Sequence, residues 1–503
     1  MNKTKKKKLF KQIKKFFLNM SNFQIIFIVY LFVTLSAGLL LLLPISQQEN
    51  QNVKFIDALF TAASAFSDTG LTTLTTVTTW SDFGQLLILI LILSGGIGIF
   101  ALKFFLINVI FNKSISINSR NVLEKERGTN SSGELKKTIK VSVSFLFITI
   151  LIATMVLWLI FYYETGVFKW TDNNGQVHDY TKYDPKGRVW ISFKCAFFHA
   201  ISAINNAGFD ILSDSSLTPY YGVYSIQIVF IILLIIGGIG FPVIYDVLKF
   251  ISYKFRKRTD FKFSLFSKVS CLTYLIVFLI GFGFVLIFEI GNKNGIWWTS
   301  STKTGSYSNK MMCIIFHVFS TRNAGFTTLD PNTTKFTNAS LVIFAIMMFI
   351  GSAPSSTAGG IRTTTLAIIV MSVWNKMRGI QGVRAFKRNV DNETIYSSFM
   401  VFVLSIFIVL ITSIICFTSL DTIWGEADSE KLNFADIFYD VCSAFGTTGL
   451  STGLTSSLNL ISKLAIILTM FIGQLGISST LLVWKKTNPK DNFSYIHENI
   501  LIG

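Results

Sequence analysis

The stretch that decides the fold is 64–73, SAFSDTGLTT, because the chain contains it four times in altered form. The first copy, Phe55–Gly70, reads FIDALFTAASAFSDTG, and it aligns without a gap on the last copy, Phe434–Gly449, which reads FADIFYDVCSAFGTTG. The two middle copies are Phe198–Phe209, FHAISAINNAGF, and Phe316–Phe326, FHVFSTRNAGF. Each copy predicts a short amphipathic helix followed by a turn that ends in glycine. Four copies in one chain indicate four pieces of one pore.

The composition indicates a protein with many membrane-spanning segments. Of the 503 residues 51% are hydrophobic and only 14% are charged, against about a quarter charged in soluble domains. The net charge of +18 does not predict nucleic-acid binding, because the basic residues lie in blocks between apolar runs. The apolar run that follows the basic amino end is long enough to span a bilayer and lacks a cleavage site, which favours a first membrane helix over a signal peptide. The five cysteines form no metal-binding spacing.

Apolar runs of spanning length predict eight membrane helices and an all-α membrane fold. One copy of the motif separates the two helices of each pair, so the repeating unit is helix, pore loop, helix, with four units around one pore. The predicted spans are 21–45, 84–112, 139–165, 223–252, 267–291, 338–374, 394–420 and 459–484.

The distribution of basic residues predicts the topology. Most of the 45 Lys and Arg lie before the first span, between repeats or after the last span, and these segments are therefore cytoplasmic. The four motifs then enter from the outer face of the cell membrane, and both termini lie in the cytoplasm. The expected units are a basic amino-terminal segment (1–20), repeats 21–112, 139–252, 267–376 and 394–486, linkers 113–138, 253–266 and 377–393, and a carboxy-terminal segment (487–503).

The glycine turns favour the binding of a monovalent cation. At membrane depth a loop persists only where it lines water or is buried in protein. Glycine permits a positive φ, so neighbouring carbonyl groups can point at a common axis and replace the hydration shell of an ion. An internally duplicated transporter with merely structural turns is the alternative. The predicted filter consists of Asp68, Thr69, Gly70, Asn206, Ala207, Gly208, Asn323, Ala324, Gly325, Thr447, Thr448 and Gly449.

Three further glycines follow the motifs at similar distances, Gly95, Gly237 and Gly473. A direct role in the pore and close helix packing in lipid are both open interpretations of these small residues. His199 and His317 occupy matching FHxxS contexts and are expected to be packed side chains. Arg322, beside the third turn, is expected to bind Asp210 or Asp330 or to reach solvent.

On these motifs the chain resembles the Trk/Ktr/HKT superfamily of potassium translocation subunits. The resemblance covers nearly the whole chain and is carried by NAGF at Asn206–Phe209 and Asn323–Phe326 and by TGLST at Thr448–Thr452. It implies that K⁺ is the transported ion and that each repeat contributes one filter glycine. Because only about twenty residues precede the first span, the chain looks like a Ktr-type membrane subunit. That type implies a homodimer with one pore per subunit, on a cytosolic nucleotide-binding regulatory ring of RCK-type subunits.

The sixth span is interrupted by Gly351–Arg362, GSAPSSTAGGIR. By resemblance this stretch is a loop that gates the pore below the filter, whereas a kinked but continuous helix is the alternative. We expect the loop to have little packing to hold it. A basic residue of the family is replaced here by Gln474, and Asp68 adds a carboxylate near the first turn. The predicted gate residues are Gly351, Ser352, Ser355, Ser356, Thr357, Gly359, Gly360, Arg362 and Gln474.

The sequence therefore predicts inward conduction of K⁺ through a channel-like pore that is controlled from the cytoplasm. A Na⁺-conducting or weakly selective relative of the same fold is the alternative. No clustered intramembrane His, paired carboxylates or Ser/Lys dyad indicates an enzyme. No organic cofactor and no nucleic-acid partner are expected, and Na⁺ is considered as a modulator. The basic inner segments Lys249–Lys268 and Lys376–Arg388 are the expected docking surface for the regulatory ring.

Overall fold

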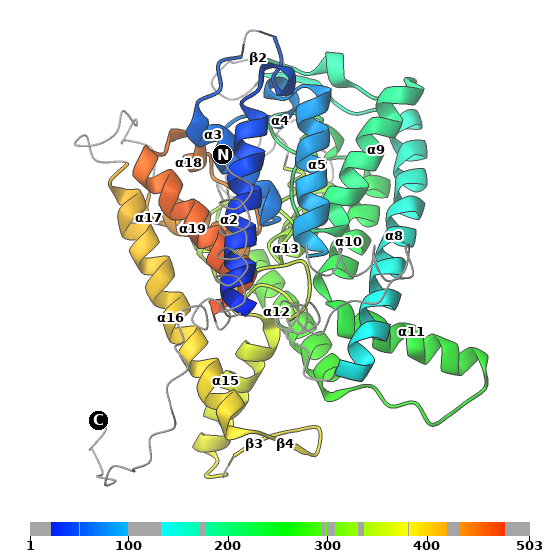
Figure 1. Ribbon diagram of the computed structural model, residues 1–503, viewed down its shortest axis with the longest axis vertical. Helices are drawn as coiled ribbons and strands as arrows, with labels where there is room; N and C mark the ends of the chain where they lie inside the picture. Colours follow the sequence, from blue (N-terminus) through cyan, green and yellow to red (C-terminus); the bar gives the residue numbers. More distant parts are fainter. Residues whose placement is uncertain are drawn as a thin grey trace, which may run out of the picture.

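The computed structural model describes residues 22–49, 51–98, 132–171, 177–293, 297–298, 307–329, 336–380, 382–419 and 433–477. Within these ranges the chain is mostly helical, and its long helices stand together in one bundle (Figure 1). The prediction of a mostly helical fold is confirmed. The amino-terminal segment 1–20, the inner end of the second span and the carboxy-terminal segment 487–503 lie outside the described residues.

Among the described residues, four helices are long and apolar enough to cross a membrane by themselves. Each is the first helix of a predicted repeat, and its 20 or more residues would extend about 30 Å or more at 1.5 Å per residue. These helices are α2 (Asn22–Leu41), α8 (Ser132–Tyr163), α12 (Leu265–Gly291) and α16 (Asn392–Phe417).

The second helix of each repeat is shorter in the described residues, so the count of eight spans stays a prediction. Side-chain caps begin three of these helices, where Ser81, Thr337 and Asn459 each accept a hydrogen bond from the backbone N–H three residues on. The four helices are α5 (Asp82–Gly96), α10 (Tyr224–Gly238), α14 (Asn338–Ile350) and α19 (Leu460–Leu475).

The prediction of an unbroken fourth span over 223–252 is wrong. The chain bends by 105° between α10 and α11 (Phe241–Phe255). Gly240 has a φ of +84°, which an L side chain rarely adopts, and Pro242 lies in the first turn of α11. This pair of residues ends one helix and begins the next, although the hydrophobicity continues across the bend.

The short helices of the four motifs, which we call pore helices after their predicted role, lie at the centre of the bundle, one in each predicted repeat. They are α3 (Phe55–Phe66), α9 (Val189–Ile204), α13 (Tyr307–Ser320) and α17 (Phe434–Gly446). The pore helix of the first repeat, α3, packs against α2, α5 and α19. The pore helix of the fourth repeat, α17, packs against α14, α16 and α19. The last repeat therefore meets the first, as a closed arrangement requires.

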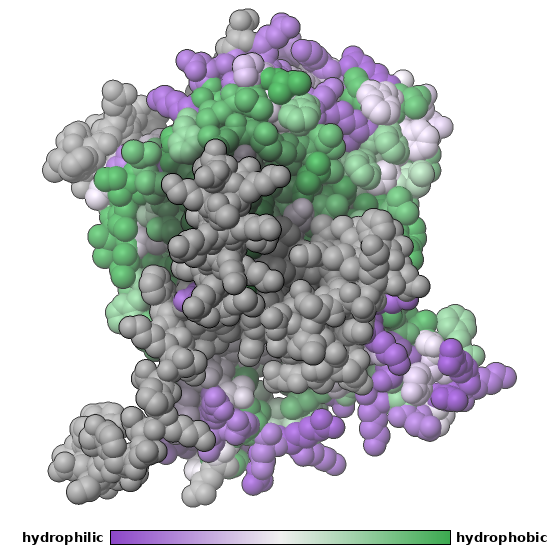
Figure 2. All heavy atoms as spheres, in the orientation of Figure 1, coloured by the Kyte–Doolittle hydropathy of each residue, from purple (hydrophilic) through white to green (hydrophobic). Residues whose placement is uncertain are grey.

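Two short β-hairpins, which an all-α prediction does not include, mark the opposite ends of the molecule (Figure 1). One pairs β1 (Lys169–Thr171) with β2 (Val177–Asp179), and the other pairs β3 (Val383–Ala385) with β4 (Arg388–Val390). Between the two ends, the coloured side chains that Figure 2 shows above and beside the grey atoms are mainly hydrophobic. Exposed apolar residues such as Phe32 and Ile152 belong to a surface that suits lipid better than water.

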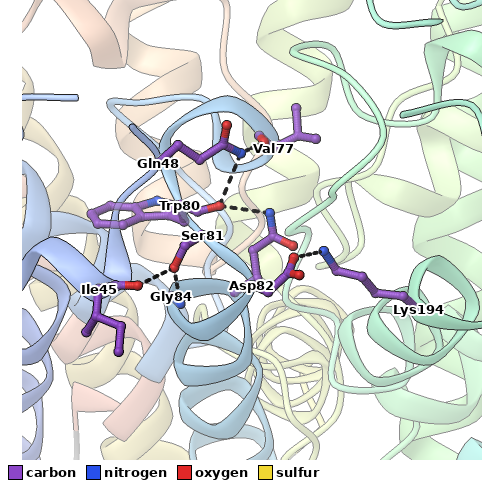
Figure 3. Close-up of polar contacts among 9 residues, drawn as sticks. Ile45, Gln48, Val77, Trp80, Ser81, Asp82, Gly84 and Lys194 are labelled. Atoms are coloured by element: carbon purple, nitrogen blue, oxygen red, sulfur yellow. Dashed lines mark hydrogen bonds and ion pairs between the residues drawn. The ribbon is translucent and has the colours of Figure 1, made fainter. Parts of the chain in front are cut away.

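The start of α5 is tied to its neighbours by the polar contacts in Figure 3. The Ser81 hydroxyl accepts a hydrogen bond from the N–H of Gly84 (3.2 Å) and donates one to the carbonyl of Ile45 (2.6 Å). Asp82 forms an ion pair with Lys194 of α9. The helix after the first motif is thus held to the pore helix of the second repeat.

Candidate functional site

The four motif glycines meet in a closed ring. A Cβ placed on Gly70 would lie 3.0 Å from the Cα of Gly208, and one placed on Gly208 would lie 3.0 Å from the Cα of Gly325. A Cβ on Gly325 would lie 3.2 Å from the Cα of Gly449, and one on Gly449 would lie 2.9 Å from the Cα of Gly70. All four glycines have a φ between 69° and 89°. The four repeats therefore surround one axis, and a side chain at any of the four positions would be strained and crowded.

Backbone carbonyl groups lie beside each glycine of the ring. The Cβ placed on Gly70 would approach the carbonyl oxygen of Ala207 to 2.4 Å, and the Cβ on Gly449 would approach that of Thr69 to 2.2 Å. The carbonyl oxygens of Ala324 and Thr448 complete the set, at 3.0 Å and 2.3 Å from the Cβ positions of Gly208 and Gly325. Carbonyl dipoles converging on one axis are the groups that can coordinate a dehydrated monovalent cation.

The residue two before each glycine also has a positive φ. The values are 50° for Asp68, 55° for Asn206, 120° for Asn323 and 50° for Thr447. Asp and Asn adopt this region more readily than most residues, whereas a β-branched Thr is strained there. A positive φ at this position is therefore repeated four times, with Asn323 departing from the other three, although the side chains differ.

A cavity of about 500 Å³ lies on one side of the ring and is lined by all four glycines. Its wall also carries three carboxylate residues, Asp210, Asp214 and Asp436. Burial raises the pKa of Asp210 to about 7, although N–H groups of Ser213 and Leu212 donate to its carboxylate. The carboxylate of Asp214 contacts Nδ1 of His178 on β2 at 3.0 Å. An acidic cavity beside the carbonyl groups raises the local concentration of cations.

The turns are held from behind by the pore helices in two different ways. In the middle repeats a pore-helix serine donates to the carbonyl after the glycine, from Ser202 to Phe209 at 2.7 Å and from Ser320 to Phe326 at 2.5 Å. The aligned Ser64 and Ser443 have no hydrogen-bond partner for their hydroxyls in the part of the chain that the structure describes.

In the fourth repeat the carboxylate of Asp440 on the pore helix supports the turn instead, by accepting hydrogen bonds from the loop after the glycine. It accepts hydrogen bonds from the hydroxyls of Ser451 (2.6 Å) and Thr455 (2.9 Å). The backbone N–H of Thr452 donates to it as well (2.9 Å). The sequence analysis missed Asp440. The signal lies in the alignment of the copies, because the position three before the shared serine is polar in all four: Thr61, His199, His317 and Asp440.

The two histidines are packed, as predicted. Nδ1 of His199 contacts the carbonyl of Cys195 at 2.7 Å, and Nε2 of His317 contacts the hydroxyl of Tyr439 at 3.3 Å. The expectation that Arg322 reaches solvent is wrong, because the residue is 2% exposed. The alternative partner Asp330 lies outside the described residues. Its Nη1 donates to the carbonyl of Met347 at 3.3 Å, and its guanidinium lies 4.9 Å from the ring centre of Tyr274.

The glycines of the second helices allow close packing. A Cβ on Gly95, Gly237 or Gly473 would lie 2.1, 2.2 or 2.0 Å from a carbonyl oxygen at the end of the pore helix of the same repeat. The carbonyls belong to Phe66, Ile204 and Phe445 respectively. Between the two interpretations, the geometry favours packing, since these residues let the second helix approach the end of the pore helix.

Residues 351–362 form a non-helical loop between α14 and α15 (Thr363–Met377), which excludes a kinked but continuous helix. The loop passes beneath two pore helices: the Ser352 hydroxyl donates to the carbonyl of Arg322 (2.6 Å), and the N–H of Gly360 donates to that of Phe445 (3.2 Å). Gly359 lies so close to the fourth turn that a Cβ on it would be 2.6 Å from Cγ2 of Thr447.

The loop is also bonded to the bend between α10 and α11. The N–H of Ala353 donates to the carbonyl of Gly238 (3.2 Å), and the N–H of Phe241 donates to the carbonyl of Ser355 (3.1 Å). The Thr357 hydroxyl donates to the carbonyl of Gly237 (3.4 Å). Ser352, Ser356 and Thr357 are buried. The expectation that little packing holds the loop is therefore wrong.

The end of the loop is connected to the first turn through α19. Nη2 of Arg362 donates to the carbonyl of Gln474 at 3.2 Å, and Nε2 of Gln474 lies 3.4 Å from Oδ2 of Asp68. At the start of the loop, a Cβ on Gly351 would lie 2.1 Å from the carbonyl oxygen of Gly359 and 3.2 Å from the Cα of Gly360. The residues predicted as filter and as gate thus form one contiguous cluster.

The sequence of the chain matches the TrkH family, described as cation transport proteins, over residues 3–496. The chain belongs to the TrkH family of cation transport proteins. It is 32% identical over 480 residues to the Ktr system potassium uptake protein D of Bacillus subtilis, an alignment that covers 95% of this chain and 97% of that one. It is 33% identical over 490 residues to the potassium/sodium uptake protein NtpJ of Enterococcus hirae, with 96% and 98% covered.

The fold is similar to that of the potassium transporter TrkH from Vibrio parahaemolyticus, with a TM-score of 0.65. The similarity covers 93% of this chain and 86% of that one, at 16% sequence identity. Together with the long apolar helices, family membership makes the chain a multi-pass membrane protein of the Trk/Ktr type. It is a cation transport protein and not an enzyme.

Proposed function

We propose that this protein takes up K⁺ through a channel-like pore, with the glycine ring as its selectivity filter. The observation that carries the proposal is the closed sequence of contacts Gly70, Gly208, Gly325, Gly449 and back to Gly70. The acidic cavity beside the ring supports entry of cations from that side. Because the basic segments are expected in the cytoplasm, the side of the cavity would be the outer side. Four helix–pore loop–helix repeats in the cell membrane, with both termini in the cytoplasm, complete this proposal.

The loop 351–362 is the proposed gate. Its Ser352 hydroxyl and its Gly360 N–H donate to carbonyls at the ends of two pore helices, and its Gly359 meets Thr447 two residues before the fourth glycine. Movement of this loop would change the inner entrance of the filter. In line with the names of the Ktr relatives, which describe a system, a separate cytosolic ring of nucleotide-binding RCK-type subunits would control the loop. The membrane subunit itself would be a homodimer with one pore per chain.

A Na⁺-conducting or weakly selective transporter is the second candidate. The specific observation is the carboxylate of Asp68 within the first turn, 3.4 Å from the amide of Gln474. A fixed negative charge attracts any cation, so it does not favour K⁺ over Na⁺. The name of the Enterococcus hirae relative, which mentions both ions, supports keeping this candidate. Na⁺ as a modulator of K⁺ flux belongs to the same question.

The experiment that tests the proposal replaces each ring glycine by serine and measures K⁺ and Na⁺ flux in liposomes. A side chain at Gly70, Gly325 or Gly449 would collide with a carbonyl oxygen at 2.2–2.4 Å, whereas at Gly208 the approach is 3.0 Å. Displacing one carbonyl and straining the backbone cost about 1–3 kcal/mol, so we expect the preference for K⁺ over Na⁺ to fall about ten-fold. Gly208→Ser should be the mildest of the four.

Glycine-to-serine variants outside the ring, at positions with open space, provide the control for this experiment. Gly222→Ser and Gly283→Ser introduce the same side chain where a Cβ meets nothing within 4 Å, so ion preference should stay unchanged. If all four ring variants kept the ion preference of the unmodified chain, the carbonyl ring would not be the filter. A parent protein that already carries Na⁺ as fast as K⁺ would favour the second candidate.

A further inference from the structure

Segment 241–263, which contains α11 and the loop after it, runs out of the bundle at the end opposite to the acidic cavity. It is oriented at 105° to α10, and Figure 1 shows it projecting sideways at the lower end of the molecule. Asp246 of α11 connects this segment to the start of α12, because its carboxylate accepts hydrogen bonds from the hydroxyls of Ser264 and Ser267 (both 2.6 Å). Ser264 caps the long apolar helix α12. Helix α11 therefore lies across the bundle at the level where α12 begins.

One face of α11 is apolar and exposed. Val247, Phe250, Ile251 and Phe255 are 38%, 40%, 42% and 85% exposed, and their positions i, i+3, i+4 and i+8 place them in one stripe. Such a stripe is unfavourable in water, and it suits a helix that lies in the interface of a bilayer.

The same segment carries six basic residues against two acidic ones. Phe261 and Phe263 pack against Phe250, with ring centres 5.8 and 5.3 Å apart, so the loop folds back along the helix and brings Lys262 beside it. Among the residues that the structure describes, no ion pair involves the exposed basic side chains of this segment. These side chains are Lys254, Arg256, Lys257, Arg258 and Lys262.

We propose that segment 241–263 binds the anionic headgroups of phospholipids in the inner leaflet. The apolar stripe would lie against the acyl chains and the basic side chains would meet the phosphates. The proposal rests on the membrane orientation given under the proposed function. The hairpin β3–β4 also carries exposed basic side chains, Arg384 and Arg388, and one exposed aromatic ring, Phe386 (51%), whereas its Val383 and Ala385 are buried. A stripe of four apolar residues beside basic side chains, as in α11, suits a lipid surface better than a single exposed ring does.

A lipid-bound α11 also has a route to the loop 351–362. The first residue of α11, Phe241, donates its N–H to the carbonyl of Ser355, and a Cβ on Gly240 would lie 2.6 Å from the carbonyl oxygen of Pro354. The helix and the loop therefore share one rigid contact at the bend. Headgroups that hold α11 in the plane of the interface also hold this side of the loop.

The test uses the full chain in a neutral detergent and measures lipid binding by native mass spectrometry and by thermal shift. The probes are short-chain phosphatidylglycerol, short-chain phosphatidylcholine and inorganic phosphate. The test variant is K254Q/R256Q/K257Q/R258Q, whose side chains are all exposed. The matched control, K376Q/R378Q/R384Q/R388Q, removes the same charge from the hairpin region. Each basic residue near an anionic surface strengthens binding about five-fold, so we expect phosphatidylglycerol to bind the α11 variant at least about ten-fold more weakly. The control should bind like the unmodified chain.

Three results would overturn the proposal. The first is equal binding of phosphatidylglycerol by the α11 variant and the unmodified chain. The second is binding of inorganic phosphate as tight as that of phosphatidylglycerol, which would make this a site for a free anion. The third is loss of a co-expressed regulatory ring by the α11 variant with lipid binding intact, which would make this a protein docking surface. None of these readouts uses ion flux, so a failure of the proposed transport function is recognised separately. F255S, which keeps every charge, should weaken the binding of phosphatidylglycerol less than the quadruple substitution K254Q/R256Q/K257Q/R258Q does.

Discussion

The middle two turns of the ring and the outer two share a glycine with a positive φ and have different supports. In repeats 2 and 3 a single neutral hydrogen bond from Ser202 or Ser320 holds the carbonyl after the glycine. In repeat 4 a buried carboxylate, Asp440, collects the hydroxyls and the N–H of the following loop. In repeat 1 the aligned Thr61 only donates to the carbonyl of Asp57 in its own helix (2.9 Å). Four-fold repetition therefore applies to the conformation at the axis and not to the chemistry behind it.

The largest effect is expected from removing the charged support. Asp440→Ala leaves three hydroxyls and one N–H without their buried acceptor, which costs about 3 kcal/mol or more, because hydrogen bonds to a charged group are the strong ones. We expect a lower Tm of the purified protein and a loss of preference for K⁺ over Na⁺. Asp440→Asn keeps one acceptor oxygen and should be intermediate in both measurements.

The aligned residue of the first repeat provides the control. Thr61→Val removes a hydroxyl that bonds only within α3, so Tm and ion preference should change little. If Asp440→Ala were as mild as Thr61→Val, the carboxylate would not support the fourth turn, and the contrast between the repeats would have no energetic meaning.

A smaller effect is expected beneath the ring, where repeat 3 has the loop 351–362 after its second helix. The two ends of the loop touch, since a Cβ on Gly351 would lie 3.2 Å from the Cα of Gly360. Removal of residues 353–357 therefore shortens the loop without separating α14 from α15. If the loop gates the pore, K⁺ flux in liposomes should rise several-fold and should no longer respond to a regulatory subunit. Folded protein with unchanged, still regulated flux would contradict the gate.

The sequence predicted the parts that repeat and failed where a single neighbour decides. Four copies of one motif predicted the positions of the glycines, because each copy reports the same backbone turn. The bend at Gly240 was missed because the apolar run continues across it, and only the pair Gly240 and Pro242 marks the break. Asp440 was missed, and Arg322 was expected in the wrong surroundings, for another reason. Their partners are Ser451, Tyr274 and Met347, and no pattern within the chain brings these residues together before folding.

The neutral supports of the middle repeats should matter less than Asp440. Ser202→Ala and Ser320→Ala each remove one hydrogen bond, worth about 1 kcal/mol, to a carbonyl next to a ring glycine. We expect the preference for K⁺ over Na⁺ to fall a few-fold in each variant. Ser64→Ala and Ser443→Ala are matched controls, since these hydroxyls bond to no residue that the structure describes. Equal effects of all four substitutions would show that the middle turns do not depend on their serines.

The smallest effect distinguishes the two middle turns from each other. The residue after NAGF is Asp210 in repeat 2 and Thr327 in repeat 3, and both line the acidic cavity. Burial raises the pKa of Asp210 to about 7, so its carboxylate is charged above that pH and neutral below it. A charged carboxylate attracts K⁺ to the cavity, and flux at low K⁺ should therefore fall as the outer pH decreases from 8 to 6, by about two-fold.

Asp210→Asn should hold flux at the low-pH value throughout. Asp179→Asn is the control, because the Thr181 hydroxyl and Lys169 lower the pKa of that exposed carboxylate to about 2 and it keeps its charge over this range. A pH dependence that persists in Asp210→Asn would assign the effect to another group and leave the two middle turns equivalent.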